Sequence, residues 1–389
     1  MKKIFTILLL LCTYEIVSAQ QIKLASKSTK TIHSASENLE RKIYVQLPMD
    51  YGKVNKRYPI ILLFDAQDQS LYNYTSSVVD RLTWTNDIPE AILVGVVQND
   101  RSKELNFERN ENSSLQFLDF IKNDLLGYLN KSYSLNGYYM LIGHSLGGQF
   151  VTNAMLTYPE IFKSAISISG ALNYPNQDNV IKSKILSKID DYLANTPDDK
   201  FKHQKYYFSS GDDGYQESGF KLGAMLVDSS LKDNKPNLKA WHFELLKGFN
   251  HMTTPLVSIP AGLLFVFQDW HFSDSLAMDV LLYNKKDPLD VLQGKKEKIA
   301  KSYGNEIELP YNSYAQFASY YLSKGEINKA ELLLNRLIKL YPHDDETYSL
   351  MAEVAIKRGK FEDAIDYYKK AQSKSSIDKY AEKIKSLMK

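Results

Sequence analysis

Runs of apolar residues recur along the first two thirds of the chain and predict the strands of a sheet. Two of them, 58–65 and 91–97, are nearly unbroken, as expected of parallel strands that are buried on both faces. Other strand patterns run together or alternate with polar residues, at 41–48, 138–142, 164–169, 205–211 and 240–246.

Segments with the period of an amphipathic helix lie between these runs. Apolar residues within 115–129 fall on one helical face, and 148–156 and 216–234 continue without a strong breaker. Strands that alternate with helices form βαβ units, which build a mostly parallel, doubly wound sheet. We therefore predict an α/β domain over residues 40–270.

The pattern changes near residue 270. Residues 271–310 are rich in lysine and predict a helical linker. From residue 311 the chain repeats with a period of 34, through the pairs Tyr314/Tyr348, Phe317/Met351, Ala318/Ala352, Gly325/Gly359, Ile327/Phe361 and Ala330/Ala364. This spacing resembles tetratricopeptide repeats, so residues 311–389 are predicted to form two repeats and a capping helix, a small all-α region packed on the linker or on the first domain.

The beginning of the chain has the parts of a secretory signal peptide. Two lysines precede an apolar run over 4–12 that is too short to span a bilayer, and Val17 and Ala19 are small residues suited to a cleavage site. We expect residues 1–19 to be removed, which leaves no membrane anchor. Cys12 is the only cysteine, so the mature chain would have no disulfide and no thiol nucleophile. The protein is expected to be exported, to the periplasm rather than the medium.

The charge balance indicates no polyanionic partner. The chain has 48 Lys and Arg against 46 Asp and Glu, and its 27 tyrosines are spread along the sequence. Neither a nucleic acid nor an anionic membrane is therefore expected as a partner. No cluster has the spacing of a zinc site or of a calcium loop, and we expect no metal and no organic cofactor.

The sequence GHSLG at residues 143–147 stands between a predicted strand and a predicted helix. In that context G-x-S-x-G is typical of a nucleophile elbow, a tight turn that exposes the serine hydroxyl at the carboxyl end of a strand. The following helix directs its positive N-terminus at the same point. Ser145 is therefore the candidate nucleophile. The alternative is an ordinary strand–helix junction in which the glycines permit close packing.

A serine hydroxyl needs a base, an orienting acid and donors for the oxyanion. In proteins with this elbow the chain order is Ser, then Asp or Glu, then His. Among seven histidines, His251 lies on a loop after the last predicted strand, and is the candidate base rather than a loop histidine bonded to the backbone. Asp212, Asp213 and Glu217 are the candidate acids. We favour Asp213, because Asp212 suits a turn cap and Glu217 suits a helix start.

Two backbone N–H groups are expected to form the oxyanion hole. One belongs to Leu146, the residue after the nucleophile. The other is expected in the loop that follows residue 65, where Gln67 is preferred and Ala66 is the alternative.

Four segments resemble the esterase family of α/β-hydrolases that includes enterobactin-type and feruloyl esterases: YVQLPMDYGKVNKRYPIILLFDAQ, ILVGVVQNDR, FLDFIKNDLLGYLNKSYSLNGYYMLIGHSLGG and LLKGFNHMTTPLVSIPAGLLFVF. The resemblance covers residues 40–270 and implies Ser145 as nucleophile, His251 as base and Asp213 as acid. The chain departs from the family's pattern at 104–107 and 169–174, segments expected to border the substrate pocket. The substrate's identity therefore does not carry over.

Together these features predict a serine carboxylic-ester hydrolase that acts on a small-molecule ester through an acyl-enzyme. The alternatives are an acyltransferase with the same triad, and a non-catalytic scaffold protein. The repeats are expected either to bind a protein or peptide partner or to brace the first domain.

Overall fold

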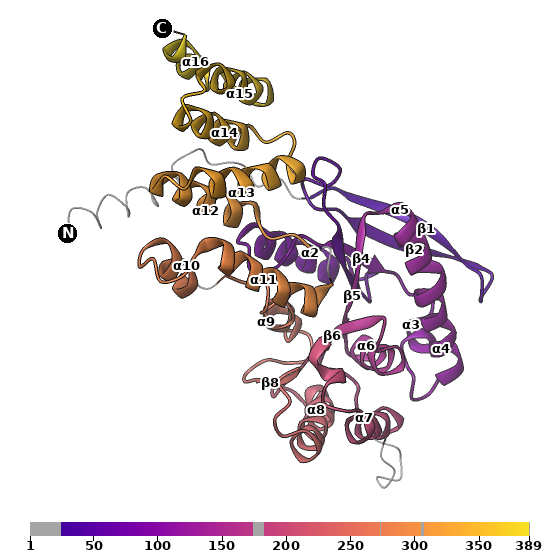
Figure 1. Ribbon diagram of the computed structural model, residues 1–389. Coiled ribbons are helices and arrows are strands. Elements are labelled where there is room, and N and C mark those ends of the chain that lie inside the picture. The colour runs from indigo at the N-terminus through magenta and orange to yellow at the C-terminus, as the bar shows by residue number, and fades with distance from the viewer. Residues whose placement is uncertain (1–24, 174–182, 273, 305–306, 389) are drawn as a thin grey trace.

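The computed structural model describes residues 25–173, 183–272, 274–304 and 307–388 (Figure 1). The predicted signal peptide, residues 1–19, lies outside this range. No helix within the described ranges is both long and apolar enough to cross a membrane.

The described residues contain one sheet of eight strands. The strands are β1 (Lys27–Ser34), β2 (Leu39–Gln46), β3 (Tyr58–Leu63), β4 (Ile92–Val96), β5 (Leu135–His144), β6 (Phe162–Ile168), β7 (Lys205–Gly211) and β8 (Trp241–Leu246). Their order is β1-β2-β4-β3-β5-β6-β7-β8. The pairs β1–β2 and β2–β4 are antiparallel, and the other neighbours are parallel. The sheet is therefore mostly parallel, as predicted.

Helices cover both faces of the sheet, because alternate residues of a strand point to opposite sides. In β3, Ile60 and Leu62 belong to one apolar cluster, and Ile61 and Leu63 to the other. The first cluster is completed by α4 (Glu111–Asp119), α5 (Leu126–Ser132), α6 (Leu146–Thr157), α7 (Lys184–Asn195) and α8 (Tyr215–Asn234). The second takes in α2 (Gln69–Trp84), α9 (Pro255–Val266) and α11 (Pro288–Tyr303). This arrangement is an α/β-hydrolase-like fold.

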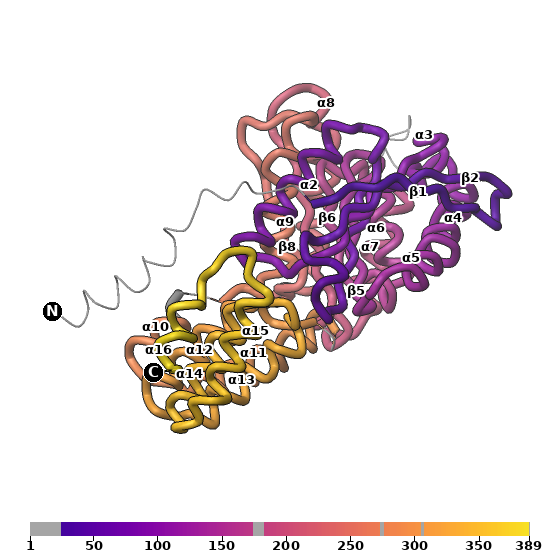
Figure 2. The backbone as a smooth tube through the Cα atoms, turned by 90° about the horizontal axis from the view of Figure 1, so that it is seen from above, coloured from indigo at the N-terminus to yellow at the C-terminus, as the bar shows by residue number. Residues whose placement is uncertain are grey.

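The C-terminal part is helical and follows the period of 34. After α10 (Asp274–Leu281) and α11 come α12 (Tyr311–Lys324), α13 (Ile327–Leu340), α14 (Asp345–Lys357), α15 (Phe361–Lys374) and α16 (Ala381–Leu387). Gly325 and Gly359 hold equivalent positions between paired helices with φ of 76° and 73°, a conformation that glycine adopts without a steric penalty. Figure 1 shows the pairs α12–α13 and α14–α15 stacked outward from the sheet, and Figure 2 shows them at the opposite end of the molecule from the β1–β2 hairpin.

The first helix pair is joined to the sheet through a shared apolar core. Residues of α12 and α13 belong to the same buried cluster as one face of β3 and β5. Polar contacts reinforce the joint, because Asn55 donates its backbone N–H to Leu340 O at 2.9 Å and its side-chain N–H to Lys339 O at 3.0 Å. Asn136, near the amino end of β5, donates to Tyr303 O at 3.1 Å.

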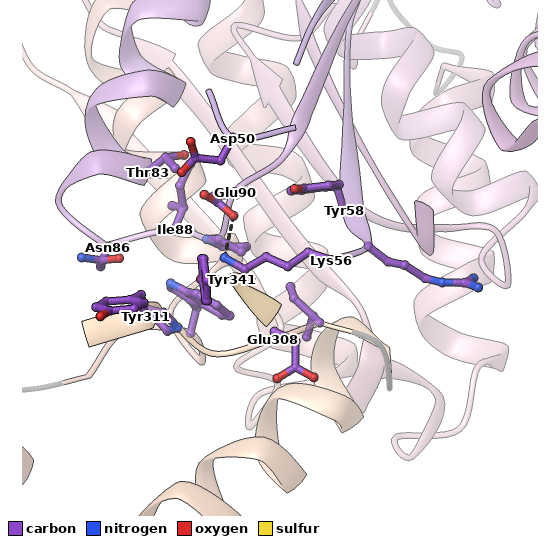
Figure 3. A pocket seen from close by; sticks show the side chains of 15 residues that line it. Asp50, Lys56, Tyr58, Thr83, Asn86, Ile88, Glu90, Glu308, Tyr311 and Tyr341 are labelled. Carbon is purple, nitrogen blue, oxygen red and sulfur yellow. Dashed lines mark hydrogen bonds and ion pairs between the residues drawn. The ribbon is translucent and has the colours of Figure 1, made fainter. Parts of the chain in front are cut away.

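A cavity of about 150 Å³ lies at this joint (Figure 3). Lys56 crosses it, pairs with Glu90 at 2.8 Å and places its ammonium 4.5 Å from the centre of the Tyr341 ring. Burial alone would lower the pKa of Lys56, but Glu90 and Tyr341 outweigh burial and raise it. Lys56 thus supplies, from within the chain, the cation that an acidic and aromatic lining binds. The cavity lies at the amino end of β3, whereas the candidate catalytic residues follow the carboxyl ends of the strands.

Candidate active site

Ser145 occupies a strained turn between β5 and α6. Its φ and ψ are 61° and −117°, a conformation that a residue with a side chain adopts only where its surroundings hold it. A Cβ on Gly143 would lie 2.2 Å from Gly147 O, so the turn requires glycine at that position. The backbone N–H of Ser145 donates to Ile168 O at 2.9 Å, and its carbonyl accepts from Ala171 at 3.0 Å. The elbow is therefore fixed to the end of the neighbouring strand β6.

His251 and Glu217 form a buried pair beside this elbow. The Nδ1 atom of His251 lies 2.9 Å from Oε2 of Glu217, and the two residues are 4% and 1% exposed. The other carboxylate oxygen, Oε1, accepts from Ser169 Oγ at 2.7 Å, Ser210 Oγ at 2.9 Å and Gly211 N at 2.6 Å. Burial alone would raise the pKa of Glu217, but hydrogen bonds led by that of His251 outweigh it and lower the pKa. The carboxylate is thus ionised and fully hydrogen-bonded.

This geometry corrects the preference for Asp213 as the partner of His251. Asp213 is exposed and its backbone N–H donates to Phe249 O at 3.1 Å, while the Asp212 carboxylate accepts from Gly248 N at 2.7 Å. Glu217 does lie in the first turn of α8, as expected of a charge at a helix start. It lies on the buried face of that helix, however, the face that also carries the apolar residues Ala224, Val227 and Leu231. A carboxylate in line with that apolar face was the available sequence signal.

A second histidine contacts the first. His144, inside the elbow, has Nε2 at 2.8 Å from the carbonyl oxygen of His251, and the two ring centres are 4.5 Å apart. Burial and the nearby His251 lower the pKa of His144 to about 4, so the ring is neutral and Nε2 carries the proton that it donates. The ring of Phe220 stacks on His251 at 4.2 Å. The imidazole of His251 is therefore oriented by three neighbouring side chains.

The two backbone groups expected at the oxyanion hole have no acceptor within the described residues. Leu146 is the first residue of α6, where a backbone N–H has no partner within the helix. The loop after β3 offers Gln67 rather than Ala66, because the N–H of Ala66 already donates to Val96 O at 3.1 Å. Both Leu146 and Gln67 are thus free to donate to a bound group.

Asp65 links the Gln67 loop to its neighbours. Its carboxylate binds Arg101 through two hydrogen bonds, Nε to Oδ1 at 2.6 Å and an η-nitrogen to Oδ2 at 2.9 Å. The side chain of Gln67 donates to Asp65 Oδ1 at 3.0 Å and accepts from the backbone N–H of Gln98 at 3.2 Å. Arg101 is the last residue of the segment ILVGVVQNDR that carries the family resemblance, whereas no sequence pattern pointed to Asp65 as its partner.

Among the residues that the structure describes, no three His, Cys, Asp or Glu side chains come together as metal ligands would.

The family described as "Putative esterase" matches residues 34–219. The match includes Ser145 and Glu217 and ends before His251. A search of the curated proteins finds no match to this chain.

Several solved structures share the fold. A protein from Capnocytophaga ochracea is 18% identical with a TM-score of 0.64, over 93% of this chain and 99% of that one. An IroE-like serine hydrolase from Shewanella oneidensis is 16% identical with a TM-score of 0.62, over 79% and 98%. The siderophore hydrolase EstB from Aspergillus nidulans is 16% identical with a TM-score of 0.51, over 66% and 99%. At these identities the likeness shows the α/β-hydrolase-like fold.

Proposed function

We propose that the protein is a serine ester hydrolase in which Ser145, His251 and Glu217 act as a catalytic triad. The observation that carries the proposal is the buried His251–Glu217 pair, with Nδ1 and Oε2 2.9 Å apart, beside a serine held at a φ of 61°. The esterase family match and the likeness to structures named as serine and siderophore hydrolases support ester hydrolysis.

In the proposed reaction the Ser145 hydroxyl attacks the acyl carbon of the ester while His251 Nε2 takes its proton. Glu217 accepts the Nδ1–H bond, which fixes the tautomer that leaves Nε2 free and stabilises the imidazolium that forms. The backbone N–H groups of Leu146 and Gln67 donate to the oxyanion. His251 then protonates the departing alcohol, and the acyl group stays on Ser145. Water, deprotonated by His251, attacks the acyl-enzyme and releases the carboxylic acid.

We further propose that the paired helices α12–α13 and α14–α15 are tetratricopeptide repeats whose first pair braces the hydrolase domain. The shared core and the contacts of Asn55 with the end of α13 support a bracing role. A protein or peptide partner bound to the repeats is the alternative role. Export after removal of residues 1–19, with the periplasm as destination, remains a proposal that rests on the sequence pattern.

Hydrolysis of p-nitrophenyl acetate, butyrate and octanoate by the chain without residues 1–19, beside Ser145→Ala, tests the proposal. We expect turnover that falls about 10⁶-fold in the variant, as when the nucleophile of a serine hydrolase is removed. Circular dichroism should show the same fold in both proteins. Labelling by a fluorophosphonate, which reacts with an activated serine, should disappear in the variant as well. If the wild-type chain neither hydrolyses the esters nor takes the label, the hydrolase proposal fails and the scaffold alternative gains.

A further inference from the structure

Three loops meet around the Asp65–Arg101 ion pair at the carboxyl ends of neighbouring strands. Asp65 follows β3, Arg101 follows β4, and the elbow follows β5. Arg101 also donates to the carbonyl of His144 in the elbow, at 3.3 Å. Asp65 is only 5% exposed and has a φ of 63°, and its backbone N–H donates to the Gln98 side chain at 2.8 Å. The pair thus connects the loop that carries Gln67 to the turn that carries Ser145.

The Asp65 carboxylate also lies against the first turn of α6. A Cβ placed on Gly147 would be 3.1 Å from Oδ2 of Asp65, and Gly147 directly follows Leu146. A carboxylate at this position without a partner would repel negative charge that develops on a substrate oxygen. Arg101 cancels that charge through two parallel hydrogen bonds, the geometry that suits a guanidinium and a carboxylate.

We propose that Arg101 and Asp65 are positioning residues that hold the Gln67 loop against the elbow and keep the oxyanion hole free of net negative charge. Asp65 orders the loop through its bonds to Gln67 and Arg101. Arg101 neutralises the buried charge of Asp65, so that an oxyanion can form nearby. The inference rests on the proposed hydrolase function and names the groups that maintain the hole. Neither residue is expected to contact the reacting atoms.

The proposal predicts an unusual order of activities in a double-mutant cycle. Arg101→Met removes the cation and leaves the Asp65 carboxylate uncompensated, so kcat on p-nitrophenyl acetate should fall about 100-fold, the usual effect of losing one oxyanion donor. Asp65→Asn keeps a side chain that tolerates positive φ and should cost about 10-fold or less, because no uncompensated anion remains. The double variant should be faster than Arg101→Met alone, because it removes the repelling charge as well. Arg101→Lys keeps the charge without the two parallel bonds and should fall between wild type and Arg101→Met.

A thionoester substrate separates this role from a merely structural one. Sulfur accepts hydrogen bonds more weakly than oxygen, so the preference for the oxygen ester over the thionoester reports the quality of the oxyanion hole. We expect that preference to shrink in Arg101→Met and to recover in the double variant, with KM changing less than kcat. Thermal unfolding of each variant checks that it is folded.

The inference is overturned if Arg101→Met keeps wild-type kcat, or if the double variant is as slow as Arg101→Met with an unchanged ester preference. Failure of the proposed function would give a different result. The wild-type chain would then show no hydrolysis that is sensitive to Ser145→Ala, and the inference would fall with the function.

Discussion

The two ends of the β3 and β5 strands are built in contrasting ways. At the carboxyl ends of β3, β5 and the neighbouring strand β6, Asp65, Ser145 and Ser169 all have positive φ, and hydrogen-bonded polar side chains link the loops. At the amino ends, aromatic and aliphatic side chains of the C-terminal helices pack onto the sheet, as where Tyr303 meets Tyr138 at 5.4 Å. The strained backbone is thus concentrated at the candidate active site, and apolar packing that offsets its cost lies at the other end of the strands.

The largest effect is expected at the carboxyl ends, from Glu217→Gln. The substitution preserves size but removes the charge that stabilises the imidazolium, and the new amide can donate to Nδ1, which favours the wrong tautomer of His251. We expect kcat to fall about 10⁴-fold, as happens in serine hydrolases whose triad acid loses its charge. Steady-state hydrolysis of p-nitrophenyl butyrate measures the change.

Asp213→Asn is the matched control, because it removes a carboxylate only four residues away, before the start of α8. Its exposed side chain should leave kcat within about 3-fold of wild type, as is usual for surface substitutions. A loss in Asp213→Asn as large as that in Glu217→Gln would contradict the assignment of the acid.

Most of the fold could be predicted from the sequence, because buried parallel strands such as β3 and β4 leave unbroken apolar runs. The strand β1 could not, since it is an edge strand whose residues are mostly polar and exposed, with only Ile32 and Ser34 buried. No helix is predicted from the sequence where α7 lies. Its buried residues Ile185, Leu186, Ile189 and Leu193 do follow a helical period.

The site could be predicted where local geometry dictates it, and not where it depends on packing between distant segments. The tight turn at Ser145 and the loop that carries His251 have local signatures. The choice between Asp213 and Glu217 depended on which carboxylate α8 turns inward, and on donors from Ser169 and Gly211. No short motif encodes such contacts, since they form only when β6, β7 and α8 are assembled.

A smaller effect, on stability, is expected at the amino ends from Leu334→Ala. Leu334 on α13 is fully buried in the cluster that includes one face of the sheet. The truncation should lower the free energy of unfolding by about 2–5 kcal/mol. Because the core is shared, the whole hydrolase domain should unfold at a lower urea concentration. Urea unfolding followed both by circular dichroism and by residual ester hydrolysis measures this shift.

Tyr368→Ala is the comparison within the same region. Tyr368 on α15 is buried in a separate cluster formed by α14, α15 and Tyr380. Its loss should loosen the outer helix pair and leave the midpoint for loss of hydrolysis unchanged, because its cluster is separate from the core shared with the sheet. If Leu334→Ala also left that midpoint unchanged, the first pair would not brace the domain.

The last effect concerns the pH dependence of stability and isolates one partly buried polar group at the carboxyl ends. The pKa of His144 is lowered to about 4 in the folded chain from an ordinary 6.5. Between these values the unfolded chain binds a proton that the folded chain does not, so the free energy of unfolding falls as pH decreases from 6.5 to 4. The loss from this residue is about 3 kcal/mol over the whole interval.

His144→Gln places an N–H donor near the same position without a group that titrates there. Its stability, measured by urea unfolding at pH 7 and pH 4.5, should therefore fall less than that of wild type, while Ser145→Ala should fall as wild type does. Parallel losses in His144→Gln and wild type would mean that His144 is not held neutral in the folded chain, and that the elbow does not depend on a neutral ring beside His251.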